Sequence, residues 1–151
     1  MSESGNKMQL VRNFAEDSIW VARPMRVVYL SAADLSEIET MAIRLSGLGA
    51  GMSHAEDTYA AVEMVMDHPG GFGLLIADCD SLGGIEEGDK LFRMLGESIQ
   101  QLPVILTATD LAEQVFPTDK SAPIRLRAPL TPVALRLGIE HAARSREAMT
   151  A

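Results

Sequence analysis

The feature that most constrains this chain is an unbroken apolar run, Leu74 to Ala77, that ends directly in Asp78 and, two residues later, Asp80. A run of this length, followed by turn-forming residues at 81–84, is typical of a strand buried on both faces of a parallel sheet. A buried helical segment would give a similar pattern, so the run alone leaves that alternative open. Carboxylates at the C-terminal end of such a strand lie where open α/β sheets place their ligand sites. The run therefore predicts a functional site at this end of the sheet.

Length and charge narrow the class of protein. A chain of 151 residues with 47% hydrophobic and 23% charged residues is typical of one folded domain. The net charge of −8 argues against a general nucleic-acid partner, because such binding depends on Lys and Arg that neutralise phosphates. The single cysteine, Cys79, excludes an internal disulfide framework. No apolar run approaches the roughly 20 residues that span a bilayer, and no signal-peptide pattern begins the chain, so we expect a cytoplasmic protein without a membrane partner.

The chain divides into a short extension and one domain. Residues 1–24 combine a polar start with partly helix-spaced apolar residues at 8–21, and end in Pro24. We predict that this extension packs either on the domain itself or on a partner, and Trp20, the only tryptophan, is the candidate anchor. Residues 25–148 form the predicted domain. His141 is followed by only ten residues, so we expect no output domain after it.

Strand-like and helix-like segments alternate along this domain. The predicted strands are Met25–Leu30, Ala50–Ala55, Gly73–Asp78, Pro103–Thr109 and Ile124–Arg127. Helices are predicted to begin at Asp34, at Glu56 and at Thr131, and to span Glu86–Gln100, with one further short helix at Asp110–Phe116. This alternation predicts an α/β fold with a doubly wound parallel sheet, helices on both faces and right-handed crossovers.

Apolar spacing predicts which helix faces are buried. The inward residues are expected to be Leu35, Ile38, Met41, Ala42 and Leu45 on the first helix, Ala61, Val62, Val65 and Met66 on the second, Leu91, Phe92, Leu95 and Ile99 on the third, and Val133, Ala134, Leu137, Gly138 and His141 on the last.

Four short runs carry a resemblance to a known family. In chain order they are 49–55, 74–78, 102–108 and 128–131. With them, the sequence from Met25 to about Ala143 resembles the receiver domain of bacterial response regulators. The resemblance implies a flavodoxin-like, five-stranded sheet in the order 2-1-3-4-5. It also implies the family's chemistry, in which an aspartate at the end of the third strand accepts a phosphoryl group with the help of Mg²⁺.

The family's site residues can be matched to this chain one by one. Asp78 takes the phosphoacceptor position, and Asp80 is the alternative when counting back from Gly88. Ser31 and Ala32 stand at the family's acidic pair, Thr107 or Ala108 at its hydroxyl position, and Ala128 at its lysine position. Arg127 precedes Ala128, but side chains alternate along a strand, so it is expected to point to the opposite face. The chain therefore resembles a degenerate receiver, or pseudo-receiver.

Three functions remain open from the sequence. The first is a stand-alone pseudo-receiver that signals by binding a protein partner, such as a histidine kinase, a phosphotransfer protein or a regulator, or by forming a homodimer. The second is a working single-domain response regulator phosphorylated on Asp78, and only this alternative requires Mg²⁺. The third is a small-molecule or nucleotide binder, which predicts a concave pocket at the strand ends. His54, His68 and His141 are scattered across separate elements, so no metal site is expected. The sequence has no phosphate-binding fingerprint and no nucleophile elbow, and no other cofactor and no enzyme activity are expected.

Overall fold

The protein folds around one parallel sheet. The structure, a computed structural model, describes residues 25–98, 102–118 and 122–150. The strands lie in the order β2-β1-β3-β4-β5, so the predicted sheet and its order are confirmed. Their bounds are β1 Arg26–Leu30, β2 Gly51–Ala55, β3 Leu74–Asp78, β4 Val104–Ala108 and β5 Ile124–Arg127. The extension at 1–24 and Ile99 lie outside the described residues.

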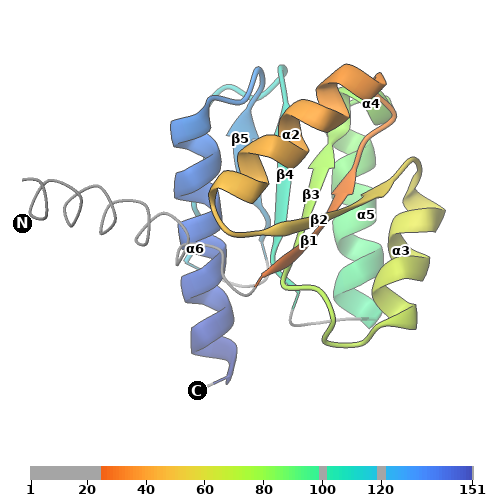
Figure 1. Cartoon of the computed structure of the whole chain (residues 1–151), viewed down its shortest axis with the longest axis vertical. Helices are drawn as coiled ribbons and strands as arrows, with labels where there is room; N and C mark the ends of the chain where they lie inside the picture. The colour runs from red at the N-terminus through yellow and green to blue at the C-terminus, as the bar shows by residue number, and fades with distance from the viewer. Residues whose placement is uncertain (1–24, 99–101, 119–121, 151) are drawn as a thin grey trace, which may run out of the picture.

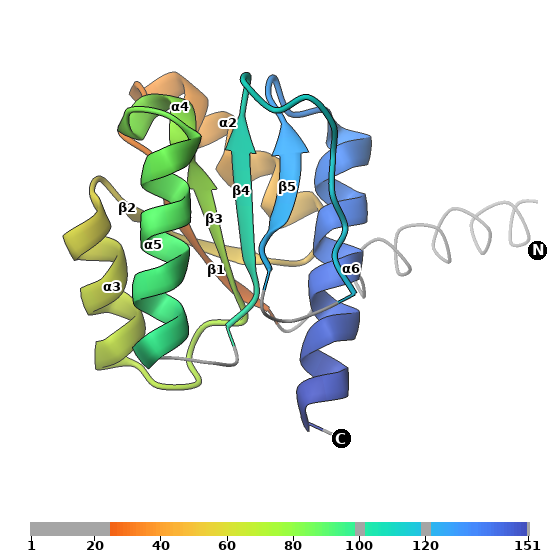
Figure 2. The same cartoon turned by 180° about the vertical axis from the view of Figure 1, so that it is seen from behind.

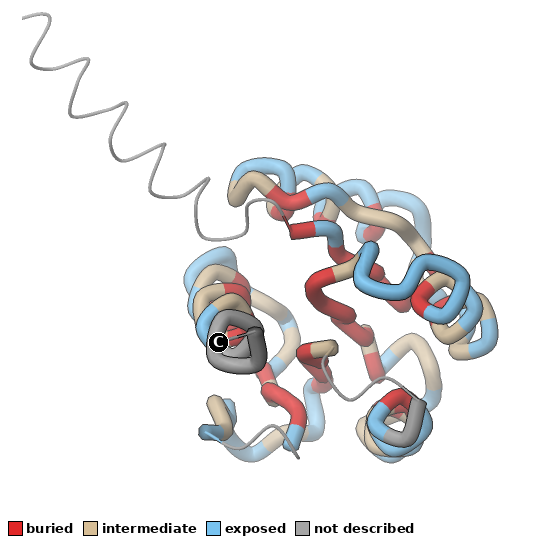
Figure 3. Tube along the Cα trace, turned by 90° about the horizontal axis from the view of Figure 1, so that it is seen from below, coloured by how far each residue is buried: buried red, intermediate tan, exposed pale blue. Residues whose placement is uncertain are grey.

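Helices cover the two faces of the sheet (Figures 1 and 2). On one face, buried residues of α2 (Leu35–Gly47) and α6 (Pro132–Thr150) form a core cluster with every strand except β2. On the other face, α3 (Thr58–Asp67) and α5 (Ile85–Ser98) pack over residues of β1, β2, β3 and β4. Figure 3 shows the buried trace concentrated in the strands between these two helical layers. None of the described helices is long and apolar enough to cross a membrane.

The apolar run that ends in Asp78 is buried on both sides, as predicted. Leu74 and Ile76 belong to the core under α2 and α6, whereas Leu75 and Ala77 belong to the core under α3 and α5. A short helix, α4 (Cys79–Leu82), follows the strand where the sequence suggested only a turn. Gly83 ends this helix at φ 114°, in the left-handed region that glycine adopts without steric cost.

The helix predicted at Asp110–Phe116 is absent from the described residues, so that prediction was wrong. In its place the chain is irregular, and Val115 forms an antiparallel bridge with Arg125 of β5. The reason lies in the side chains of β5. Ile124 and Leu126 face the core under α2 and α6, whereas Arg125 and Arg127 point to the opposite face of the sheet. A helix packed on that side would have to bury both arginines. Figure 2 shows β5 with no helix in front of it.

Some predicted helix faces need correction. On α6, Val133 and Leu137 are exposed, whereas Leu135, Ile139 and Ala142 are fully buried together with the mostly buried Ala134. Val133 and Leu137 are four residues apart, and so are Leu135 and Ile139. Either pair fits the buried face of a helix, so the sequence could not distinguish the two faces. Leu35 on α2 and Met66 on α3 are also exposed, although Ile38, Met41 and Leu45 of the first stripe and Ala61, Val62 and Val65 of the second lie in or against the core.

Candidate functional site

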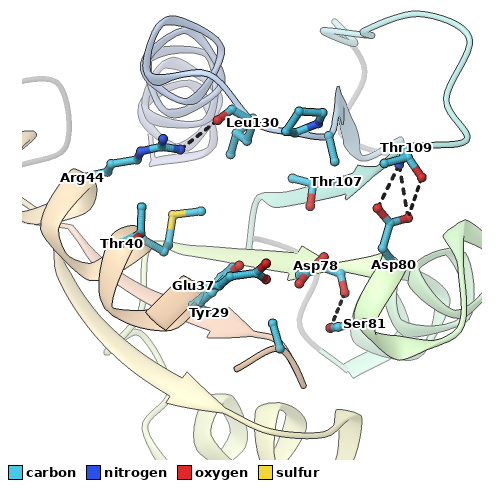
Figure 4. Close-up of a pocket in the computed structure, with 14 residues that line it drawn as sticks. Tyr29, Glu37, Thr40, Arg44, Asp78, Asp80, Ser81, Thr107, Thr109 and Leu130 are labelled. Atoms are coloured by element: carbon cyan, nitrogen blue, oxygen red, sulfur yellow. Dashed lines mark hydrogen bonds between the residues drawn. The ribbon is translucent and has the colours of Figure 1, made fainter. Parts of the chain in front are cut away.

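A pocket of about 600 Å³ opens at the C-terminal ends of the strands. It lies between α2, the ends of β3 and β4, and the loop that joins β5 to α6 (Figure 4). This is the position that open α/β sheets use for ligands. Its walls are formed by Tyr29, Ala33, Glu37, Thr40, Met41, Arg44, Asp78, Asp80, Ser81, Thr107, Thr109, Ala128, Pro129 and Leu130.

Asp78, the last residue of β3, is held from the side of β1. The hydroxyl of Ser31 donates a hydrogen bond of 2.9 Å to Asp78 Oδ2. The same hydroxyl oxygen accepts from the backbone N–H of Ala33 at 3.1 Å, which fixes its direction. Ser31 is completely buried, so this contact is shielded from water on the Ser31 side, while Asp78 itself lines the pocket. Within the described part of the chain, no hydrogen bond reaches Asp78 Oδ1.

Ser81 joins the loop after β1 to the end of β3. Its hydroxyl donates to the carbonyl oxygen of Asp78 and accepts from the N–H of Ala32, both at 2.9 Å. Ser81 lies on α4, three residues after Asp78, so one turn of this short helix returns the hydroxyl to the strand end. Ser31 and Ser81 together position Asp78, and neither carries charge.

Asp80 has a different environment from Asp78. Its carboxylate accepts from the N–H of Thr109 at 3.1 and 3.2 Å and from the Thr109 hydroxyl at 3.3 Å. Asp80 therefore fastens α4 to the end of β4, and its oxygens are engaged by protein donors.

The two candidates for the hydroxyl position lie on opposite faces of β4. Thr107 pairs with Asp78 across the sheet, lines the pocket, and donates its hydroxyl proton to the carbonyl of Ala77 at 3.3 Å. Ala108 is buried in the core under α3 and α5 and does not line the pocket. Of the two, Thr107 is the residue that the structure brings next to Asp78.

At the end of β5, Ala128 lines the pocket without offering a polar side-chain atom. Arg127 is exposed and lines a separate, smaller hollow with Glu113 and Gln114, not the pocket of Asp78. The cation that does line the Asp78 pocket is Arg44 of α2, whose Nη1 donates to the carbonyl of Leu130 at 2.8 Å.

The donor set does not fit the Mg²⁺ site that the receiver fold implies. Mg²⁺ prefers several hard oxygen ligands in a near-octahedral arrangement. In the described ranges, no three His, Cys, Asp or Glu side chains are grouped to hold a metal ion. The side chains at the acidic-pair positions are a hydroxymethyl and a methyl, and Asp80 is engaged by Thr109. These side chains therefore do not supply the set of ligands that Mg²⁺ requires.

Two buried groups next to Asp78 have shifted pKa values. The pKa of the Cys79 thiol is raised from its ordinary 9.0 to about 12, mainly by burial and also by the Asp78 and Asp89 carboxylates. The pKa of the Tyr29 hydroxyl is raised from 10.0 to about 12, mainly by burial and also by Asp78, while Ser31 opposes the shift. Both groups are therefore neutral at physiological pH, and a raised thiol pKa disfavours a reactive cysteine.

These shifts predict alkaline destabilisation. Because both groups bind their proton more tightly in the folded state, the unfolded chain loses protons first, and stability must fall as pH rises above 9.0 and again above 10.0. The expected slope is about 1.4 kcal/mol per pH unit for each proton. Urea unfolding across this range should show it. Cys79→Ala should remove the decline that begins near pH 9, and an unchanged slope in this variant would contradict the assignment.

Several residues of the site were not predicted from the sequence. Glu37 lies in the first turn of α2, where the Asp34 side chain accepts from its N–H at 3.0 Å. Thr40 and Arg44 follow it on the same helix and also line the pocket. The available signal was their spacing, since 37, 40 and 44 form a polar stripe beside the apolar stripe of the same helix.

Comparisons with known proteins identify the fold. No protein-family model and no curated protein sequence matches the chain. A response regulator receiver domain protein from Clostridium thermocellum is similar in structure, with TM-score 0.69 and 15% identity over 83% of this chain and 98% of that chain. The chemotaxis protein CheY4 of Vibrio cholerae has TM-score 0.62 and 16% identity over 78% and 98%. The signal receiver domain of an HD domain-containing protein from Pseudomonas fluorescens Pf-5 has TM-score 0.61 and 18% identity over 83% and 93%. These similarities confirm the receiver-type fold.

Proposed function

We propose that this chain is a stand-alone receiver-like signalling module of a bacterial two-component pathway that acts through protein–protein interaction, with little or no phosphorylation. Its partner would be a histidine kinase, a phosphotransfer protein or a regulator in the cytoplasm. The observation that supports this proposal is the set of side chains around Asp78, which keeps the aspartate of a receiver and lacks its charged helpers.

The argument is electrostatic. Phosphorylation would replace the single negative charge of the Asp78 carboxylate by nearly two, in a pocket that Asp80 and Glu37 also line. Phosphoryl transfer is catalysed mainly by groups that position and neutralise this charge. Ser31, Ala32 and Ala128 supply none, and Arg44, the one cation that lines the pocket among the described residues, is bonded to Leu130. Slow or absent transfer follows from this arrangement.

Incubation with acetyl phosphate and Mg²⁺, followed by intact-mass spectrometry, tests the proposal. The expected result is no phosphoryl adduct on the wild-type protein, with or without Mg²⁺. Asp78→Asn and Asp80→Asn serve as matched variants. A Mg²⁺-dependent adduct that disappears in Asp78→Asn and persists in Asp80→Asn would instead support the alternative, a working response regulator that accepts the phosphoryl group on Asp78.

A further inference from the structure

The pocket beside Asp78 presents opposite charges on facing walls. Figure 4 shows Arg44 and Leu130 on one side of the cavity and Asp78 and Asp80 across from them. Glu37 reaches the same cavity from α2. The sequence alone did not reveal this arrangement, because the cation comes from a helix that follows β1 and the carboxylates from the end of β3.

The charged groups retain unused hydrogen-bonding capacity. A guanidinium carries five N–H donors, and the hydrogen bond of Arg44 to the Leu130 carbonyl uses one nitrogen, Nη1. Among the described residues, Arg44 forms no ion pair with a carboxylate, and Asp78 and Glu37 form none with a cationic side chain. Asp78 Oδ2 accepts from Ser31, which leaves Oδ1 as its available acceptor. Asp80 differs, because Thr109 already engages it.

Between the two charged walls the lining is apolar or neutral. Met41 and Leu130 offer aliphatic surface, Ala128 and Pro129 continue it, and the buried Tyr29 and Thr107 add neutral hydroxyl-bearing side chains. A cavity of about 600 Å³ is within the range of small-molecule sites. A small-molecule binder, the third function that the sequence left open, requires a pocket of this kind.

We propose that this pocket binds a small zwitterion, with an ammonium group at Asp78, a carboxylate at Arg44 and a short aliphatic chain between them. An ammonium group donates three hydrogen bonds, which suits Asp78 Oδ1 and the neighbouring Glu37. A carboxylate accepts from guanidinium in paired geometry. A simple anion or a simple cation would leave one wall without a counter-charge while displacing its water. This inference does not depend on the signalling role.

Three five-carbon probes separate the possibilities. They are 5-aminopentanoate, glutarate and 1,5-diaminopentane, titrated into ¹⁵N-labelled full-length protein and followed by NMR. The expected result is saturable shifts of the Tyr29, Thr107 and Leu130 amides with 5-aminopentanoate alone, at a Kd of about 1 mM or tighter. Saturation by glutarate or the diamine with equal affinity, or no saturable shift with any probe, would overturn the proposal.

Charge-neutralising variants provide the second arm. Arg44→Gln and Asp78→Asn should each weaken 5-aminopentanoate binding about tenfold or more, because each removes one charge-assisted contact. Arg93→Gln is the matched control, since Arg93 is exposed on α5 and does not line the pocket. Its affinity should equal that of the wild type. Equal weakening in Arg93→Gln, or wild-type affinity in a folded Arg44→Gln or Asp78→Asn, would refute the site.

Discussion

Gly88→Ala is expected to destabilise the protein by about 1–3 kcal/mol, the usual cost of forcing extra volume into a packed core. Gly88 lies on α5 where this helix crosses Cys79. A Cβ placed there would approach Cys79 Sγ to less than the 3.0 Å limit of real contacts and would lie 3.1 Å from Leu106 Cδ2. Cys79 and Leu106 are fully buried, so neither can move aside into solvent. Chemical denaturation of the variant measures the loss.

A matched control and a rescue make the cause specific. Gly96 lies on the same helix with nothing within 4 Å of a Cβ, so Gly96→Ala should stabilise by about 0.5–1 kcal/mol through helix propensity. Combining Gly88→Ala with Cys79→Ala removes the closest clashing atom and should recover part of the loss as a favourable coupling. Additive effects of the two substitutions would show that the clash with the thiol is not the cause.

Ser31→Asp is expected to lower the free energy of unfolding by about 3 kcal/mol or more, because it buries an unpaired charge. Ser31 is completely buried and its hydroxyl lies 2.9 Å from Asp78 Oδ2, so the new carboxylate would face an existing one with no cation between them. The same substitution restores one member of the receiver's acidic pair. Millimolar Mg²⁺ should therefore recover part of the lost stability, since a ligand that binds only the folded state stabilises it.

Ala32→Asp is the control for this experiment. Ala32 is the other acidic-pair position, yet it is exposed, so a carboxylate there stays hydrated and should change stability by about 0.5 kcal/mol or less. Thermal unfolding of the wild type and both variants, each with and without Mg²⁺, gives the comparison. A Ser31→Asp protein as stable as Ala32→Asp, or a wild type stabilised by Mg²⁺ as strongly as Ser31→Asp, would contradict the electrostatic account.

The sequence predicted the sheet because its signals are local. The run at 74–77 is apolar on both sides of the chain, and the Asp34 and Asp57 caps that start α2 and α3 are each made by residues only three positions apart. Such features survive in any tertiary context that keeps the segment folded. The same reasoning placed Asp78 at the end of a buried strand.

What the sequence missed depended on contacts between distant residues. The helix predicted at 110–116 gave way to an irregular segment, next to which Arg125 binds Asp89 of α5 at 2.7 Å. That pair is separated by 36 positions in the chain. The pocket was missed for the same reason, because Arg44 meets Leu130 only once the sheet has brought α2 and the β5–α6 loop together. In both cases the structure depends on tertiary contacts, which local sequence preferences do not reveal.

The bridge between Val115 and Arg125 has a consequence for aggregation. β5 is the last strand of the sheet, and an exposed edge strand is a template on which a foreign chain can add by backbone pairing. Here the N–H and the carbonyl of Arg125 are already bonded to Val115 at 2.9 and 2.8 Å. Another chain could extend the sheet through the middle of β5 only by first displacing Val115. The irregular segment at 110–116 thus protects this edge of the sheet against pairing with strands of other chains.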